Sequence, residues 1–207
     1  MSNWDFLFSK KNTAIGEVAG IEAGKIEVFV YPEFFNKVRI GSILVINSDS
    51  IKPIGLVLKL AHTSRYGSFT PMRMTRSEIT KAYPDLEKYQ MFVSTMIYTS
   101  HLDMDKSIKH FRAGAPKLHD LVYLVKEKPL LDAFFKPRSW NFDFLRYFFE
   151  EGAGILEFRD FLYTHKRYFQ EKTSEKEDVL RAIINSLLPS SVDLRLVLQE
   201  ISEILRW

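Results

Sequence analysis

Apolar residues in the first 125 positions fall into short runs separated by turn-forming residues. Six runs are rich in Val, Ile and aromatic residues and are bounded by Gly, Pro, Asn or Ser; they cover residues 15–22, 25–31, 42–46, 54–60, 92–99 and 121–125. This pattern is typical of short antiparallel strands. Because a closed sheet has no free edges, we expect the strands to form a small barrel.

A helical insertion is predicted between the fourth and fifth runs. Thr75 and Glu78 have the spacing of a capping box, which marks the start of a helix. The helix should end before Pro84, because the residue that precedes a proline disfavours the helical conformation.

The apolar spacing becomes helical after residue 126. Asn141 is a candidate N-cap before "FDFLRYFFEEG", Ser174 and Glu177 form a second capping-box pair, and breaks fall at residues 152–154 and at Pro189. Three further segments each present one apolar face: Ile155, Phe158, Phe161, Leu162 and His165; Val179, Leu180, Ile183, Ile184, Leu187 and Leu188; and Leu194, Val197, Leu198, Ile201, Ile204 and Leu205.

The sequence therefore predicts an α+β protein with two domains. Residues 1–125 should form a closed antiparallel β-barrel of about six strands with a helical insertion. Residues 126–207 should form a bundle of four or so helices.

The absence of cysteine narrows the chemistry that the chain can perform. Disulfides, thiolate zinc sites and a cysteine nucleophile are excluded. No catalytic motif, metal site or cofactor site is expected, and we predict a protein that is not an enzyme. The net charge is +3, and Lys and Arg outnumber Asp and Glu by 16 to 12 through residue 125 but not after it, where the counts are 13 and 14. The positive excess therefore belongs to the predicted barrel.

The N-terminal segment "MSNWDFLFSKKNT" places its lysines after its apolar residues, the reverse of a secretory signal. No apolar run approaches the roughly 20 residues that a membrane-spanning helix needs. We expect a cytoplasmic protein without a membrane partner.

Two glycine clusters invite comparison with nucleotide-binding loops. Gly20, Gly24 and Lys25 have only three residues between the glycines and an isoleucine after the lysine, whereas a Walker loop needs four residues and a Ser or Thr. Gly152 and Gly154 lack the third glycine and the preceding strand of a dinucleotide fingerprint. A hairpin turn explains the first cluster better, and no ATP site is expected.

Three stretches together resemble a known barrel. They are "IGEVAGIEAGKIEVFVYPEFFNKVRIGSILVI", "KPIGLVLKLAHTSRYGSFTPMRMTRSEITKAYPDL" and "APKLHDLVYLV", with residues 83–86 (YPDL) and 117–120 (KLHD) as the most distinctive pieces. They resemble the HAS barrel, the N-terminal barrel of archaeal HerA-type DNA translocases and rotary ATP synthase subunits. The likeness covers about residues 14–125.

This resemblance implies association rather than motor activity. In HerA-type proteins the barrel precedes a RecA-like ATPase domain, but the remaining ~80 residues of this chain are too few for one. HAS barrels associate side by side in rings and offer docking surfaces. The resemblance thus implies a non-enzymatic protein-binding adaptor or regulator of a HerA-type translocase and nuclease system in DNA repair or DNA end processing, with self-association as an additional expectation.

A nucleic-acid-binding protein is the alternative prediction. Basic residues with interleaved aromatic residues suit phosphate contact and base stacking. The candidate contacts are Lys59, Arg65, Arg73, Arg76, Lys106, Lys109, Arg112 and Lys117. Ordinary solvated loops explain the same residues.

Two further groups have both a functional and a structural interpretation. His101, Asp103 and Asp105 alternate as metal ligands on a strand would, and Asp85 and Lys106 could complete a diverged nuclease site, but a strand end followed by a turn explains them as well. Phe148, Phe149 and Tyr163 fall off the main apolar stripe of the aromatic segment 139–169. They could form an exposed docking patch or belong to an aromatic core.

Overall fold

A computed structural model describes residues 3–49, 51–64, 75–82 and 90–207. The strands are β1 (Gly16–Glu22), β2 (Lys25–Val30), β3 (Ile43–Ile46), β4 (Lys52–Ser64), β5 (Gln90–Leu102), β6 (Ile108–Lys109) and β7 (Leu121–Val125). The α-helices are α1 (Asn3–Ser9), α2 (Arg76–Ala82), α3 (Lys128–Phe135), α4 (Phe144–Glu150), α5 (Ile155–Thr164), α6 (Lys166–Gln170), α7 (Lys176–Leu187) and α8 (Leu194–Leu205). Short 3-10 helices are η1 (Lys11–Thr13), η2 (Pro32–Lys37) and η4 (Thr173–Glu175).

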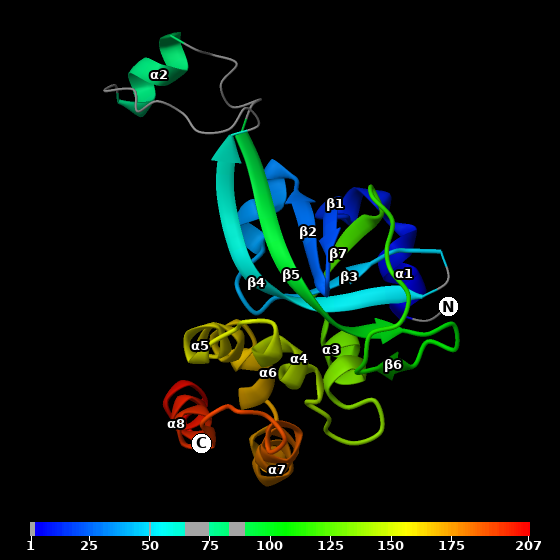
Figure 1. Cartoon of the computed structure of the whole chain (residues 1–207), viewed down its shortest axis with the longest axis vertical. Helices are drawn as coiled ribbons and strands as arrows, with labels where there is room; N and C mark the ends of the chain where they lie inside the picture. The colour runs from blue at the N-terminus through cyan, green and yellow to red at the C-terminus, as the bar shows by residue number, and fades with distance from the viewer. Residues whose placement is uncertain (1–2, 50, 65–74, 83–89) are drawn as a thin grey trace.

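Six strands close into an antiparallel barrel, as the sequence predicts (Figure 1). The strand order is β2-β1-β7-β3-β4-β5, and pairing of β2 with β5 closes the ring. Strand β6 pairs only with the end of β5, outside the ring. Strands β4 and β5 run past the barrel as a long hairpin, and α2 lies beyond its end (Figure 1).

Strand β3 shows why the apolar runs are so dense. Its four residues, Ile43 to Ile46, are all buried. Leu44 and Ile46 point into the barrel interior, whereas Ile43 and Val45 belong to the cluster that packs against the helices. A strand covered on both faces needs apolar residues at every position rather than alternation. Full burial of one such side chain stabilises the fold by about 1.5–3 kcal/mol.

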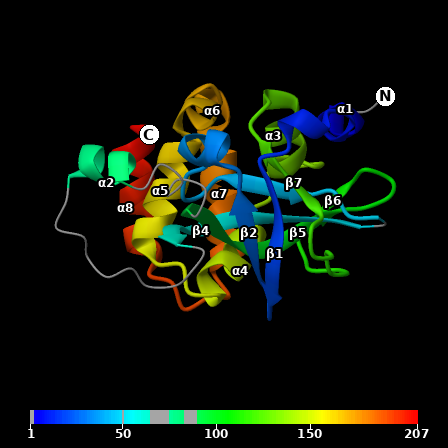
Figure 2. The same cartoon turned by 90° about the horizontal axis from the view of Figure 1, so that it is seen from above.

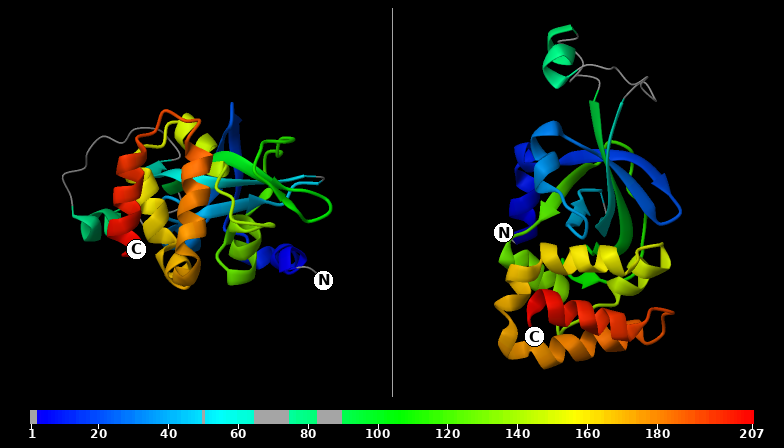
Figure 3. Two further views of the ribbon diagram at one scale, coloured as in Figure 1. Left: turned by 90° about the horizontal axis from the view of Figure 1, so that it is seen from below. Right: turned by 90° about the vertical axis from the view of Figure 1, so that its left-hand side faces the viewer.

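The helices α3 to α8 form a layer against one side of the barrel, and α1 lies beside α3 (Figures 2 and 3). One hydrophobic cluster contains the outward residues of β3, β4, β5 and β7 together with the buried residues of these helices. Helix α3, which follows residue 126, contributes Leu130, Leu131, Phe134 and Phe135 to it. The cluster therefore continues across residue 126, where the sequence predicts a domain boundary. The division into two domains stays a prediction.

The structure confirms some of the predicted turns and helix ends and contradicts others. The capping box is confirmed, because Thr75 N donates to Glu78 Oε2 at 2.7 Å and Glu78 N donates to Thr75 Oγ1 at 3.3 Å. The first glycine cluster is a two-residue hairpin turn, in which Ala23 and Gly24 both have positive φ. The second predicted capping box is not formed: Ser174 lies within η4, and α7 begins at Lys176 without a side-chain cap.

The prediction that Asn141 is an N-cap is wrong, because Asp143 holds the N-cap position of α4. Asn141 Oδ1 accepts from Asp143 N at 2.8 Å, and the helix begins at Phe144. The break at residues 152–154 is confirmed between α4 and α5.

Candidate functional site

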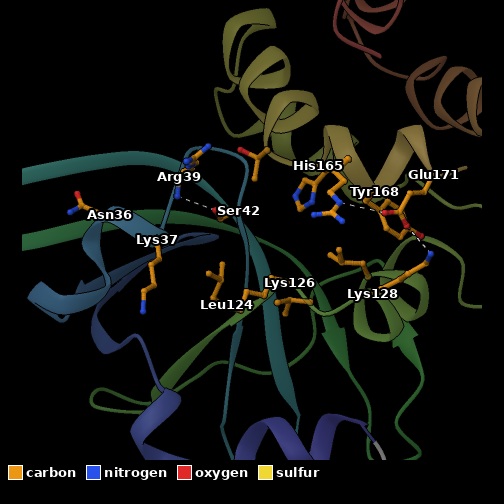
Figure 4. A pocket seen from close by; sticks show the side chains of 14 residues that line it. Asn36, Lys37, Arg39, Ser42, Leu124, Lys126, Lys128, His165, Tyr168 and Glu171 are labelled. Carbon is orange, nitrogen blue, oxygen red and sulfur yellow. Dashed lines mark hydrogen bonds and ion pairs between the residues drawn. The ribbon is translucent and has the colours of Figure 1, made fainter. Parts of the chain in front are cut away.

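A cleft of about 680 Å³ lies where the barrel meets the helical layer (Figure 4). Helix η2 and the loop before β3 form its barrel side, α5 and α6 form its helix side, and the end of β7 with the start of α3 lies between them. Its charged lining residues are Lys37, Arg39, Lys126, Lys128, Arg167 and Glu171. We call this hollow the basic cleft.

The two sides of the basic cleft are held together by hydrogen bonds to backbone carbonyls. Thr164 Oγ1 donates to Ile40 O at 2.9 Å, and His165 Nε2 donates to Gly41 O at 3.0 Å. Burial lowers the pKa of His165 to about 4, so this imidazole is neutral near pH 7. His165 therefore fixes the geometry of the cleft and adds no charge to it.

The charge of the basic cleft is poorly compensated. Glu171 is the one acidic residue among the described residues that line the cleft, and Lys128 Nζ lies 2.7 Å from Glu171 Oε2. This hydrogen bond raises the pKa of Lys128 and lowers that of Glu171. Among the described residues, Lys37, Arg39 and Lys126 form no ion pair. Three cations without an ionic partner among the described residues line one hollow, and this excess of positive charge favours an anionic ligand.

Of the predicted nucleic-acid contacts whose side chains the structure describes, none lines this cleft, and several are paired within the chain. Lys106 contacts Asp5, Lys117 Nζ lies 2.7 Å from Asp49 Oδ2, and Arg112 Nη2 lies 2.7 Å from Glu151 Oε1. The other predicted contacts are scattered: Lys59 lies on β4, Lys109 on β6 and Arg76 at the start of α2, while Arg65 and Arg73 lie outside the described residues.

The three aromatic candidates for partner binding occupy different environments. Phe148 is 0% exposed and belongs to the hydrophobic core, so the expected docking patch does not include it. Phe149 is partly buried and packs against Phe158, with ring centroids 5.8 Å apart. Tyr163 is 59% exposed on the outer side of α5. Only Tyr163 of the three presents most of its side chain to a partner.

The suggested metal ligands have structural roles: His101 lies in β5 and its Nδ1 donates to Phe111 O at 2.8 Å, whereas Asp103 and Asp105 lie in the turn after this strand. Strand β5 ends at Leu102, Asp103 Oδ1 accepts from Met104 N at 2.7 Å, and Asp105 Oδ1 accepts from Ser107 N at 2.8 Å. Asp85 lies outside the described residues. Within the described ranges, no group of three or more His, Asp or Glu side chains could hold a metal ion.

A buried serine–histidine pair has a structural role. Ser100 Oγ donates to His110 Nδ1 at 2.8 Å, because His110 Nε2 donates to Phe134 O at 3.1 Å and leaves Nδ1 as the acceptor. Ser100 is fully buried, and burial lowers the pKa of His110 to about 4. The pair joins β5 to α3 and presents no hydroxyl to a substrate.

The fold and the basic cleft define a class, a closed β-barrel protein with a helical layer and a cationic cleft between the two. No protein-family model and no curated protein matches the sequence. No helix in the described part of the chain is long and apolar enough to cross a membrane.

Proposed function

We propose that the protein is a non-enzymatic protein-binding module that holds an acidic segment of a partner protein in the basic cleft. One observation carries the proposal: one cleft is lined by Lys37, Arg39 and Lys126, which have no ionic partner among the described residues. Carboxylates of a partner would supply the missing negative charge. Complementary charge of this kind accelerates encounter and selects the partner.

Two features favour an acidic protein segment over nucleic acid. The aromatic ring that lines the cleft, that of Tyr168, has the Lys172 ammonium 5.7 Å from its centroid, which competes with base stacking there. The cleft volume of about 680 Å³ also lies in the range of pockets that receive side chains or small ligands rather than a duplex.

The HAS-barrel resemblance of residues 14–125 leads to a more specific proposal about the partner. In this proposal, the protein is a cytoplasmic adaptor or regulator of a HerA-type translocase and its nuclease, acts in DNA end processing, and can associate with itself. Gel filtration with a purified HerA-type hexamer, and separately with its nuclease, tests this proposal. Comigration that is lost when the basic cleft is altered supports it, and separate elution from both proteins contradicts it.

Direct binding measurements test the role of the basic cleft. The full chain is titrated against a fluorescent peptide of consecutive glutamates, and anisotropy gives Kd at low and high salt. We expect salt-sensitive binding that weakens about tenfold or more in the Arg39→Glu, Lys126→Glu double variant. Lys176→Glu, which reverses a charge on α7 away from the cleft, is the matched control. Equal affinity of the double variant and the wild type would overturn the proposal.

The nucleic-acid alternative is decided in the same assay. A duplex and a single-stranded oligonucleotide replace the peptide, and the variants are Lys59→Glu and Lys109→Glu. The alternative predicts that these two substitutions weaken nucleic-acid binding and reduce its salt dependence. Strong oligonucleotide binding, together with no peptide binding, would replace the acidic-segment proposal with the nucleic-acid one.

A further inference from the structure

A second hollow of about 420 Å³ adjoins the basic cleft. It lies among α1, η1, η2, the end of β7 and the start of α3, and α1 and α3 run side by side here (Figure 2). Its apolar lining includes Phe6, Leu7, Ile15, Phe34, Leu124 and Leu130. We call it the apolar groove.

The apolar groove and the basic cleft share part of their lining. Both are lined by Lys37, Leu124 and Lys126, so these three side chains lie at the boundary between the two hollows. A chain segment bound in the basic cleft could therefore extend into the apolar groove without leaving the surface.

The charges around the apolar groove have the same sign as those of the basic cleft. Lys10 Nζ lies 4.0 Å from the ring centroid of Phe6, and Lys37 Nζ lies 4.7 Å from that of Phe34. With Lys126, the groove is lined by three lysines against one acidic residue, Glu127. A basic amphipathic helix would be repelled here, whereas an acidic segment with apolar side chains fits both the lining and the charge.

We infer that the partner segment is amphipathic: its acidic residues occupy the basic cleft, and one or two large apolar side chains next to them anchor in the apolar groove. This inference rests on the proposed function, because it assumes an acidic segment in the basic cleft. Central apolar anchors supply most of the binding energy in many interfaces, while charged contacts at the rim supply selectivity.

Two peptides test the inference with the full chain. Both contain the same block of glutamates; one adds an arm with two leucines, and the other has serines in place of those leucines. We expect the leucine arm to improve Kd about tenfold in the wild type, as burial of a leucine side chain would. Phe6→Ser should abolish this gain, while binding of the serine-arm peptide is retained and shows that the variant is folded.

The matched control is Leu118→Ser. Leu118 is 58% exposed and Phe6 is 57% exposed, but Leu118 does not line the groove. The control variant should keep the full gain from the leucine arm. Equal affinity of the two peptides for the wild type, or a gain that survives Phe6→Ser, would overturn the inference and leave the proposed function standing. Failure of both peptides to bind would overturn both.

An anionic membrane surface is the competing occupant. Vesicles that contain phosphatidylglycerol are added in a parallel sedimentation assay. Cosedimentation that depends on Phe6, without a gain from the leucine arm, would assign the groove to lipid and contradict the inference. The expected result is no cosedimentation.

Discussion

Gly41 approaches the backbone of Phe161 so closely that a Cβ atom at residue 41 would lie 2.3 Å from the Phe161 Cα atom. Gly41 also has φ +79°, in the left-handed region that favours glycine. Next to this contact, His165 donates to the Gly41 carbonyl. The loop before β3 and helix α5 therefore meet through backbone atoms, and this contact sets the two sides of the basic cleft relative to each other.

Gly41→Ala should destabilise the protein strongly. The left-handed conformation costs about 1 kcal/mol for alanine, and the steric overlap adds about 1–3 kcal/mol. We expect the free energy of unfolding to fall by about 2–4 kcal/mol in urea denaturation followed by circular dichroism. Gly152→Ala is the control, because Gly152 has φ +102° with nothing near its Cβ position. A similar loss in both variants would show that Phe161 is not the cause.

Acidification should destabilise the fold between about pH 6.5 and pH 4. The pKa values of His110 and His165 are lowered by burial from 6.5 to about 4, so the unfolded chain binds protons that the folded chain does not. The stability that these neutral histidines contribute is present above pH 6.5 and is lost as pH falls toward 4. By pH 5 the loss is roughly 2 kcal/mol for each histidine.

Urea denaturation at pH 7.5 and pH 5 measures this effect. In this window unperturbed carboxyl groups stay mostly ionised, so the histidines dominate the change. His165→Gln should flatten the pH dependence by about half. An unfolding free energy that is the same at both pH values would contradict the burial of the two rings as neutral groups.

Arg112 should contribute to stability rather than to DNA binding. Its Nε donates to Tyr98 O at 2.6 Å, its guanidinium is paired with Glu151, and it lies 5.0 Å from the ring centroid of Tyr147. Arg112→Ala should lower the free energy of unfolding by about 2 kcal/mol, since it removes partly buried charge-assisted bonds.

Lys117→Ala provides the comparison for Arg112. The Lys117–Asp49 pair is 72% and 83% exposed, so the loss of this pair should leave the unfolding transition unchanged. A duplex-binding assay on both variants completes the test. A large drop in duplex affinity for Arg112→Ala, without a change in stability, would restore Arg112 as a phosphate contact.

Phe148→Ala and Tyr163→Ala should differ in their effect on stability, because Phe148 packs in the core and Tyr163 is exposed and accessible to a partner. Phe148 is fully buried in the aromatic core, and its truncation should cost about 3–5 kcal/mol of stability. Tyr163 is mostly exposed, and its truncation should leave the unfolding transition almost unchanged. Light scattering of both folded variants then shows whether Tyr163 supports self-association. A strong destabilisation by Tyr163→Ala would contradict its exposed placement.

Much of the barrel could be predicted from the spacing of apolar residues. The run 121–125 coincides with β7, and the other five predicted runs overlap β1 to β5. The sequence did not predict the extensions of β4 and β5 past the barrel, where residues such as His62 and Thr63 are polar and exposed. Backbone pairing continues there without a buried face, so the side chains carry no alternating signal. Strand β6 has only two residues and leaves no pattern at all.

The sequence by itself determined the fold class, because alternation with period two and apolar faces with period 3.6 follow from local backbone geometry. It also identified the hairpin turn at Gly24, where chain conformation depends on adjacent residues. Only the tertiary structure decided where the proposed binding surface lies. Lys37, Lys126 and Arg167 are far apart in the chain and come together because β3 pairs with β7 and α5 docks on Gly41. The same long-range packing pairs Arg112 with Glu151 and buries Phe148, since the free energy of a charge or a ring depends on its neighbours in space.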